Sequence, residues 1–257
     1  ALQDAAQGFV DILTNDGDDT YGVKIGIVPF ANSVRVGRYG LGLNPDGTAY
    51  GDGDVFVTLP VGVSYTTNHD SSSGWYGCVI EHNPDGWNSA IDTNDPYPQD
   101  VNDDFEGDWE AYRSGNYRTT CSGSGRRRVC TTSWQVSSPN NGCPYANILP
   151  LTSDYDDITA TLASMRAHGN TLSNVGLAWG HKVISPEAPF TEGASYDSNT
   201  WRKAVVLMTD GENTRHSDYS YFWRADNNQI TVTDFDDRLS EVCTALKEQG
   251  VTIYTIT

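Results

Sequence analysis

The stretch Lys203-Ala204-Val205-Val206-Leu207-Met208-Thr209 decides the fold that we expect for this chain. A nearly continuous apolar run predicts a strand that is buried on both faces, as strands of parallel sheets are. Asp210-Gly211 ends this strand, because Asp and Gly favour turns. Farther along, apolar spacing predicts a helix that Gly250 stops, and Val251–Ile256 has the composition of a last strand. Two strands joined through a helix indicate an α/β architecture.

The same alternation continues toward the N-terminus. Apolar residues recur on one helical face from Leu2 to Leu13, and Gly22–Phe30 is rich in the β-branched residues of strands. Regular patterning returns at Asn147–Thr152, and two helices follow it. The first is expected to begin after Ser153 and to stop at Gly169. We therefore expect a doubly wound α/β fold, with a mostly parallel sheet and helices on both faces.

Residues 34–147 interrupt this pattern. Clusters of Gly, Asn, Asp, Ser and Pro separate short strand-like pieces, as is typical of turns. We divide the chain into the start of the domain (1–33), a loop-rich insertion with short strands (34–147) and the remainder of the domain (148–257). Four aromatic residues of the insertion either form a small core of their own, which we favour, or contact a partner: Trp75, Trp87, Trp109 and Tyr112.

Five cysteines indicate an oxidising compartment. Four of them lie in the insertion, without a Cys-x-x-Cys pair or a His at a zinc spacing. Disulfides explain this arrangement better than buried free thiols do. Of the three possible pairings we favour Cys121–Cys130 as a local link and Cys78–Cys143 as the closure of the larger loop. Cys243 is left over, and we expect its partner beyond Thr257.

The formal charge of −18 limits the possible partners. With 34 acidic and 16 basic side chains, the surface repels nucleic-acid phosphates, so we expect no nucleic-acid partner. No apolar run approaches the roughly 18 residues that a membrane helix needs. The chain opens in what resembles the interior of a helix. We therefore expect it to be a fragment, with any membrane anchor lying upstream.

Two turns carry side chains suited to a hard cation. Ligands of open α/β sheets bind beyond the carboxyl ends of the strands, where Asp210 is expected. A carboxylate there can hold a divalent cation directly or through water, although an Asp-Gly turn after a strand is common in any case. Thr171, in Gly169-Asn170-Thr171, either caps the next helix or offers its hydroxyl oxygen to a metal.

Together these turns resemble the von Willebrand factor A family. Gly169-Asn170-Thr171 is similar to the threonine turn of that family, and Val206–Asn213 to its Thr-Asp-Gly turn, in the same order along the chain. A narrower resemblance is to the TadG-like proteins of bacterial Flp (tight adherence) pilus systems. It is carried by Gly142-Cys143-Pro144, Gly176-Leu177-Ala178-Trp179-Gly180 and Trp201-Arg202-Lys203.

One family segment, Asp-x-Ser-x-Ser, is missing. It would fall just before Ala1, so the resemblance leaves Thr171 and Asp210 as the family's metal ligands in this chain. The strand before that segment would lie between Val23–Phe30 and Val205–Met208. We therefore expect residues 1–257 alone to fold poorly.

The resemblance implies a module for adhesion or assembly without catalysis. The domain would bind Mg²⁺, or else Mn²⁺ or Ca²⁺, and leave one coordination position for an acidic residue of a partner protein such as a pilus or envelope component. It would work in the bacterial cell envelope, on the periplasmic or extracellular side, anchored to the membrane from outside this fragment.

Two other functions were weighed. A secreted hydrolase has little support, because no nucleophile motif is present and the histidines are scattered. We expect these histidines to be surface or capping residues: His82, His168, His181 and His216. A calcium-stabilised structural protein would use Asp100-x-Asn102-x-Asp104, but Phe105 replaces the glycine of an EF-hand loop and Ala111 stands at its twelfth position.

Overall fold

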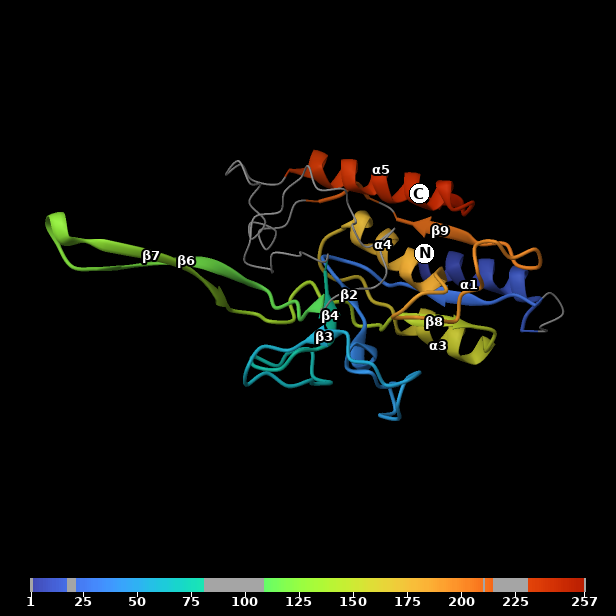
Figure 1. The fold of residues 1–257 in the computed structure, drawn as a ribbon, viewed down its shortest axis with the longest axis horizontal. Coiled ribbons are helices and arrows are strands. Elements are labelled where there is room, and N and C mark those ends of the chain that lie inside the picture. The colour runs from blue at the N-terminus through green and yellow to red at the C-terminus, as the bar shows by residue number, and fades with distance from the viewer. Residues whose placement is uncertain (1, 18–21, 81–108, 210, 215–230, 257) are drawn as a thin grey trace.

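The computed structural model describes residues 2–17, 22–80, 109–209, 211–214 and 231–256 (Figure 1). The α-helices in this part are α1 (Leu2–Thr14), α3 (Tyr155–Ser164), α4 (Ser173–Ile184) and α5 (Val232–Glu248), and the 3-10 helices are η1 (Gly37–Leu41) and η2 (Gly125–Arg127). The strands of the first half are β1 (Ile25–Ile27), β2 (Val34–Arg35), β3 (Val57–Thr58), β4 (Cys78–Val79) and β5 (Trp109–Glu110). The strands that follow are β6 (Gly115–Ser122), β7 (Val129–Val136), β8 (Leu149–Thr152), β9 (Ala204–Met208) and β10 (Thr252–Ile256).

The predicted doubly wound parallel sheet is wrong. The described strands form five separate two-stranded sheets. Three are antiparallel, namely β1–β8, β2–β4 and β6–β7, and two are parallel, namely β9–β10 and β3–β5. The reason is that an alternating pattern predicts which segments are extended but not which edges pair. Moreover, the run Gly22–Phe30 contributes a β1 of three residues, too short for a wide sheet.

Local sequence explains where the helices begin. Asp154 caps α3, and its carboxylate accepts a hydrogen bond from the Asp157 amide at 3.0 Å, so the expected cap at Ser153 is displaced by one residue. Thr231 and Asp234 form a capping box at the start of α5. The apolar stripes of α1 and α3 then pack together through Val10, Ile158 and Leu162.

Helix α4 is the centre of the molecule. It contacts β1, β8, β9 and α5, and in Figure 1 it lies between β9 and β8. It approaches the N-terminal part closely, since a Cβ at Gly176 would lie 2.5 Å from the ring of Phe30. Only a glycine allows this contact.

The aromatic residues of 34–147 share the core of α4. Trp75, Trp109 and Tyr112 are buried in one apolar cluster with Trp179, and the rings of Trp109 and Trp179 are 4.6 Å apart. The expected separate core of the insertion is therefore wrong for these three residues, while Trp87 lies outside the described part. The insertion supports the rest of the fold directly.

Two disulfides link this region, and both are those favoured from the sequence. Cys78–Cys143 spans 65 residues and is buried, whereas Cys121–Cys130 spans 9 residues. The second bond joins β6 to β7, a hairpin that extends away from the rest of the molecule (Figure 1). We call residues Gly115–Val136 the arm. Cys243 has a free, half-buried thiol.

Candidate functional site

The turn after β9 lies beside the loop that precedes α4. The Thr209 amide donates to the Ile256 carbonyl at 3.1 Å, which continues the β9–β10 ladder by one residue. The chain then turns, and a Cβ placed on Gly211 would lie 3.8 Å from the Thr171 hydroxyl oxygen. Asp210, the predicted carboxylate ligand, lies outside the described residues. Its neighbours nevertheless bring the two predicted turns together.

Hydrogen bonds join the turn after β9 to the loop that precedes α4. The Thr171 amide donates to the Thr214 hydroxyl at 2.9 Å, and the Thr214 amide donates to the Thr171 carbonyl at 2.9 Å. One residue earlier, the Asn213 side-chain oxygen accepts from the Ser173 amide at 2.7 Å. Asn213 therefore caps the N-terminus of α4 from a distant segment, and its own amide group donates to Asp236 at 2.8 Å.

Thr171 is not the cap of α4. The N-cap is Leu172, whose apolar side chain cannot make a capping bond, and Asn213 supplies the capping oxygen instead. Thr171 is partly exposed, and its hydroxyl has no hydrogen-bond partner among the described residues. No described residue thus occupies this oxygen, and a hard cation prefers oxygen donors of this kind. The described residues contain no group of three or more His, Cys, Asp or Glu side chains that could hold a metal on its own.

The other side of the Thr171 loop is held by buried Asn32. The Asn32 side-chain oxygen accepts from the Asn170 amide at 2.7 Å, and the Leu172 amide donates to the Ala31 carbonyl at 3.1 Å. Two glycines with positive φ crowd the same side chain, since a Cβ on Gly169 would lie 2.6 Å from Asn32 and one on Gly142 would lie 2.7 Å from it. Gly169 thus serves this turn and does not end α3, which stops at Ser164.

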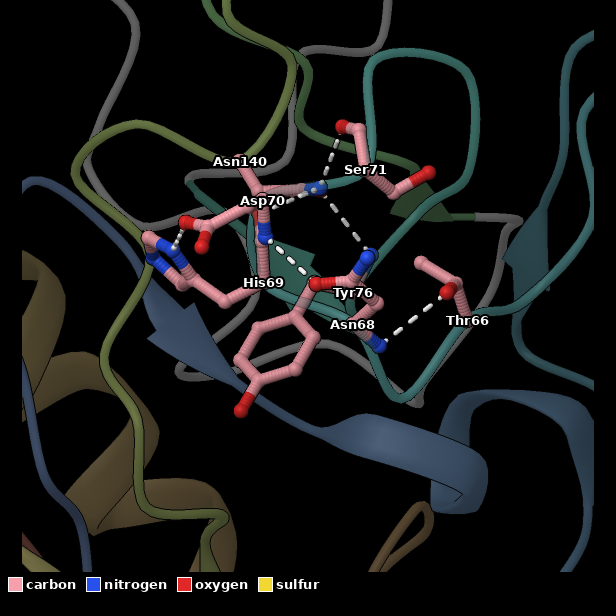
Figure 2. Close-up of polar contacts among 7 residues, drawn as sticks. All are labelled: Thr66, Asn68, His69, Asp70, Ser71, Tyr76 and Asn140. Carbon is pink, nitrogen blue, oxygen red and sulfur yellow. Dashed lines mark hydrogen bonds and ion pairs between the residues drawn. The ribbon is translucent and has the colours of Figure 1, made fainter.

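A loop of the insertion supports the segment before Thr171. Figure 2 shows Asn140 beside residues Thr66–Ser71. Its amide group donates to the carbonyls of His69 and Ser71 at 3.1 and 3.2 Å, and its oxygen accepts from the Tyr76 amide at 3.0 Å. These bonds fix the loop that carries His69.

His69 in turn packs against the segment that leads to Thr171. Its ring stacks on Tyr145 with centroids 4.4 Å apart and meets the ring of His168 edge-on at 5.0 Å. Burial, and secondarily the neighbouring His69, lowers the pKa of His168. The neutral form of His168 is favoured, so this packing needs no counter-ion.

Of the other histidines singled out from the sequence, the structure describes one, His181. His181 was expected to be a surface or capping residue, but it is buried and contacts Gln249 at 2.7 Å and the Tyr196 hydroxyl at 2.9 Å. Burial lowers the pKa of His181 to about 4. His82 and His216 lie outside the described residues, as does the acidic segment Asp100–Asp104.

The sequence did not identify the residues that hold the candidate site. Asn32, Asn213 and Thr214 all bond to the backbone of residues 170–173. One signal was available, because Asn213 and Thr214 directly follow the predicted turn. For Asn32 no pattern indicated a contact 138 residues away.

Comparison of the chain with protein-family models, curated proteins and solved structures gives no match. The candidate site therefore has to be interpreted from its own chemistry.

Proposed function

We propose that this protein is a binding module without catalysis, which captures an acidic side chain of a partner protein through a divalent cation. Mg²⁺ is the expected ion, with Mn²⁺ or Ca²⁺ as substitutes. The Thr171 hydroxyl and the Asp210 carboxylate are the proposed ligands of this chain, completed by water. When bound, the ion would supply a positive centre for the partner's carboxylate.

The observation that carries the proposal is the Thr171 hydroxyl, which has no partner among the described residues and lies beside the turn after β9. The paired hydrogen bonds between Thr171 and Thr214 bring residues 43 positions apart to one place. Hydrogen bonds also hold the loop of Thr171 on both sides, to Asn32 before it and to Asn213 after it. A preformed site loses little conformational entropy when an ion and a partner bind.

Other features support an extracytoplasmic setting. Two disulfides are typical of proteins exposed to an oxidising compartment. We propose the bacterial cell envelope, and a role in pilus assembly or surface attachment, on the resemblance of the Thr171 and Asp210 turns. Among the described helices, none has both the length and the apolar character to cross a membrane.

Mn²⁺ alone is the probe that tests the site, because its binding can be followed by paramagnetic resonance or calorimetry without a known partner. The full chain should bind Mn²⁺ at one site, with competition by Mg²⁺. Thr171→Ala should weaken binding about tenfold or more, because it removes a ligand oxygen. Asp210→Asn should do the same.

Thr200→Ala is the matched control, since this residue is exposed and, among the described residues, its hydroxyl hydrogen-bonds to Ser198 alone. Its affinity for Mn²⁺ should equal that of the unmodified chain. Unchanged Mn²⁺ binding in Thr171→Ala, with the fold intact by circular dichroism, would refute the proposal. So would the absence of any Mn²⁺ binding by the unmodified chain.

A further inference from the structure

The arm has a charge opposite to that of the rest of the molecule. Residues Gly115–Val136 contain four arginines and no Asp or Glu: Arg118, Arg126, Arg127 and Arg128. The rest of the chain keeps 12 of the 16 basic side chains and all 34 acidic ones, a formal charge of −22. We call this remainder the body. The sequence thus combines a basic arm with a strongly acidic body.

Among the residues that the structure describes, no acidic side chain neutralises the exposed arginines of the arm. The side chains of Arg118, Arg127 and Arg128 are exposed. Figure 1 shows the arm pointing away from the described helices and the other described strands. Within the described part of the chain, Arg118, Arg127 and Arg128 form no ion pair with a carboxylate. Arg118, Arg127 and Arg128 are therefore available to another molecule.

The backbone of the arm is also open to a partner. β6 and β7 pair only with each other over eight residues, and each keeps an outer edge without a described neighbour. An exposed strand edge can pair with a strand of another chain. The arginines on the arm favour a partner chain with acidic side chains. Val129 adds a large apolar side chain, 64% exposed, beside Arg128. The Cys121–Cys130 bond lies near this tip and stiffens it, which reduces the entropy lost on docking.

We propose that the arm docks on the acidic body of a second copy of this chain. A formal charge of −22 on the body attracts a tip that carries three consecutive arginines, and opposite potentials steer such encounters. The two surfaces differ, so the contact is heterologous and joins copies head to tail.

Exposed carboxylates on two helices are the expected acceptors. Asp156 and Asp157 lie in the first turn of α3, and Asp237 and Glu248 lie on α5. None of these is among the proposed ligands of the cation site. Docking of the arm and binding of Mn²⁺ are therefore separate properties, and one can fail without the other.

Sedimentation equilibrium of the full chain at low salt tests this docking. Self-association should weaken steeply as salt rises, because exposed charges are screened. Arg127→Glu/Arg128→Glu should raise the dissociation constant about tenfold or more at low salt. The control Arg202→Glu/Lys247→Glu makes the same change in net charge on exposed residues of the body. It should not weaken association.

A mixing experiment adds a directional test. Labelled Arg127→Glu/Arg128→Glu protein keeps its body and should still bind the arm of unmodified protein. A chain that stays monomeric at every salt concentration would overturn the proposal. Equal weakening by the arm and control variants would overturn it too, as would binding of the arm to heparin or anionic vesicles without self-association.

Discussion

The two disulfides should differ greatly in their effect on global stability. A crosslink restricts the unfolded chain more when it closes a longer loop. For Cys78–Cys143, with a separation of 65 residues, loop-closure entropy gives about 4 kcal/mol, and for Cys121–Cys130, with 9 residues, about 2.5 kcal/mol. Both cysteines of the first bond are buried in the core shared with α4, so all of its contribution should appear in the free energy of unfolding.

The second bond should behave differently, because it lies in the exposed arm. The arm can open locally while the core stays folded, so its loss should cost the global free energy of unfolding less than about 1 kcal/mol. Urea unfolding of Cys78→Ala/Cys143→Ala and Cys121→Ala/Cys130→Ala, followed by tryptophan fluorescence, measures both. Buried Trp75 and Trp179 report the core. Equal losses in the two variants, or a loss below about 1 kcal/mol for the first, would refute this reasoning.

Two further predictions concern polar groups in the core. Asn213→Ala should lower the free energy of unfolding by about 2 kcal/mol in urea titrations, because it leaves the buried Ser173 amide without its acceptor; an unchanged value would mean that Asn213 does not cap α4. His181 has a folded pKa of about 4 against 6.5 unfolded, so its contribution is complete above pH 6.5 and is lost as pH falls toward 4. The loss should reach about 3 kcal/mol, and the difference between the unmodified chain and His181→Gln, measured across this range, isolates it; parallel pH profiles would contradict the prediction.

Elements with a strong apolar period were predictable from the sequence. The helix expected from Leu2 to Leu13 is α1, and the strand expected at Lys203–Thr209 contains β9. The apolar residues of α1 recur on one helical face, and β9 lies in a nearly continuous apolar run, so each shows a clear pattern in the sequence. The β6–β7 hairpin was not predicted, because residues such as Arg118 and Thr120 are exposed and show no apolar alternation. The pairing of strands was equally hidden, since pairing depends on contacts between distant residues.

The candidate site was predictable only in part. The turns that contain Thr171 and Asp210 were predicted from the sequence, since Gly and Asp are typical of the ends of regular elements. The choice between a helix cap and a free hydroxyl at Thr171 could not be made locally. It depends on Asn213, which supplies the capping oxygen from 40 residues away. The supporting contacts of Asn32 likewise require the folded chain.

The predicted division into an insertion and a surrounding domain does not separate two independent parts of the candidate site. The loop that carries Thr171 touches Asn32, and Asn32 packs against Gly142, the residue before the disulfide-bonded Cys143. From the other direction, Asn213 and Thr214 hold the same loop from the turn after β9. The position of the Thr171 hydroxyl is thus set jointly by residues of the insertion and of the C-terminal part. Breaking Cys78–Cys143 should therefore disturb the cation site, although neither cysteine belongs to it, whereas breaking Cys121–Cys130 should leave the site intact.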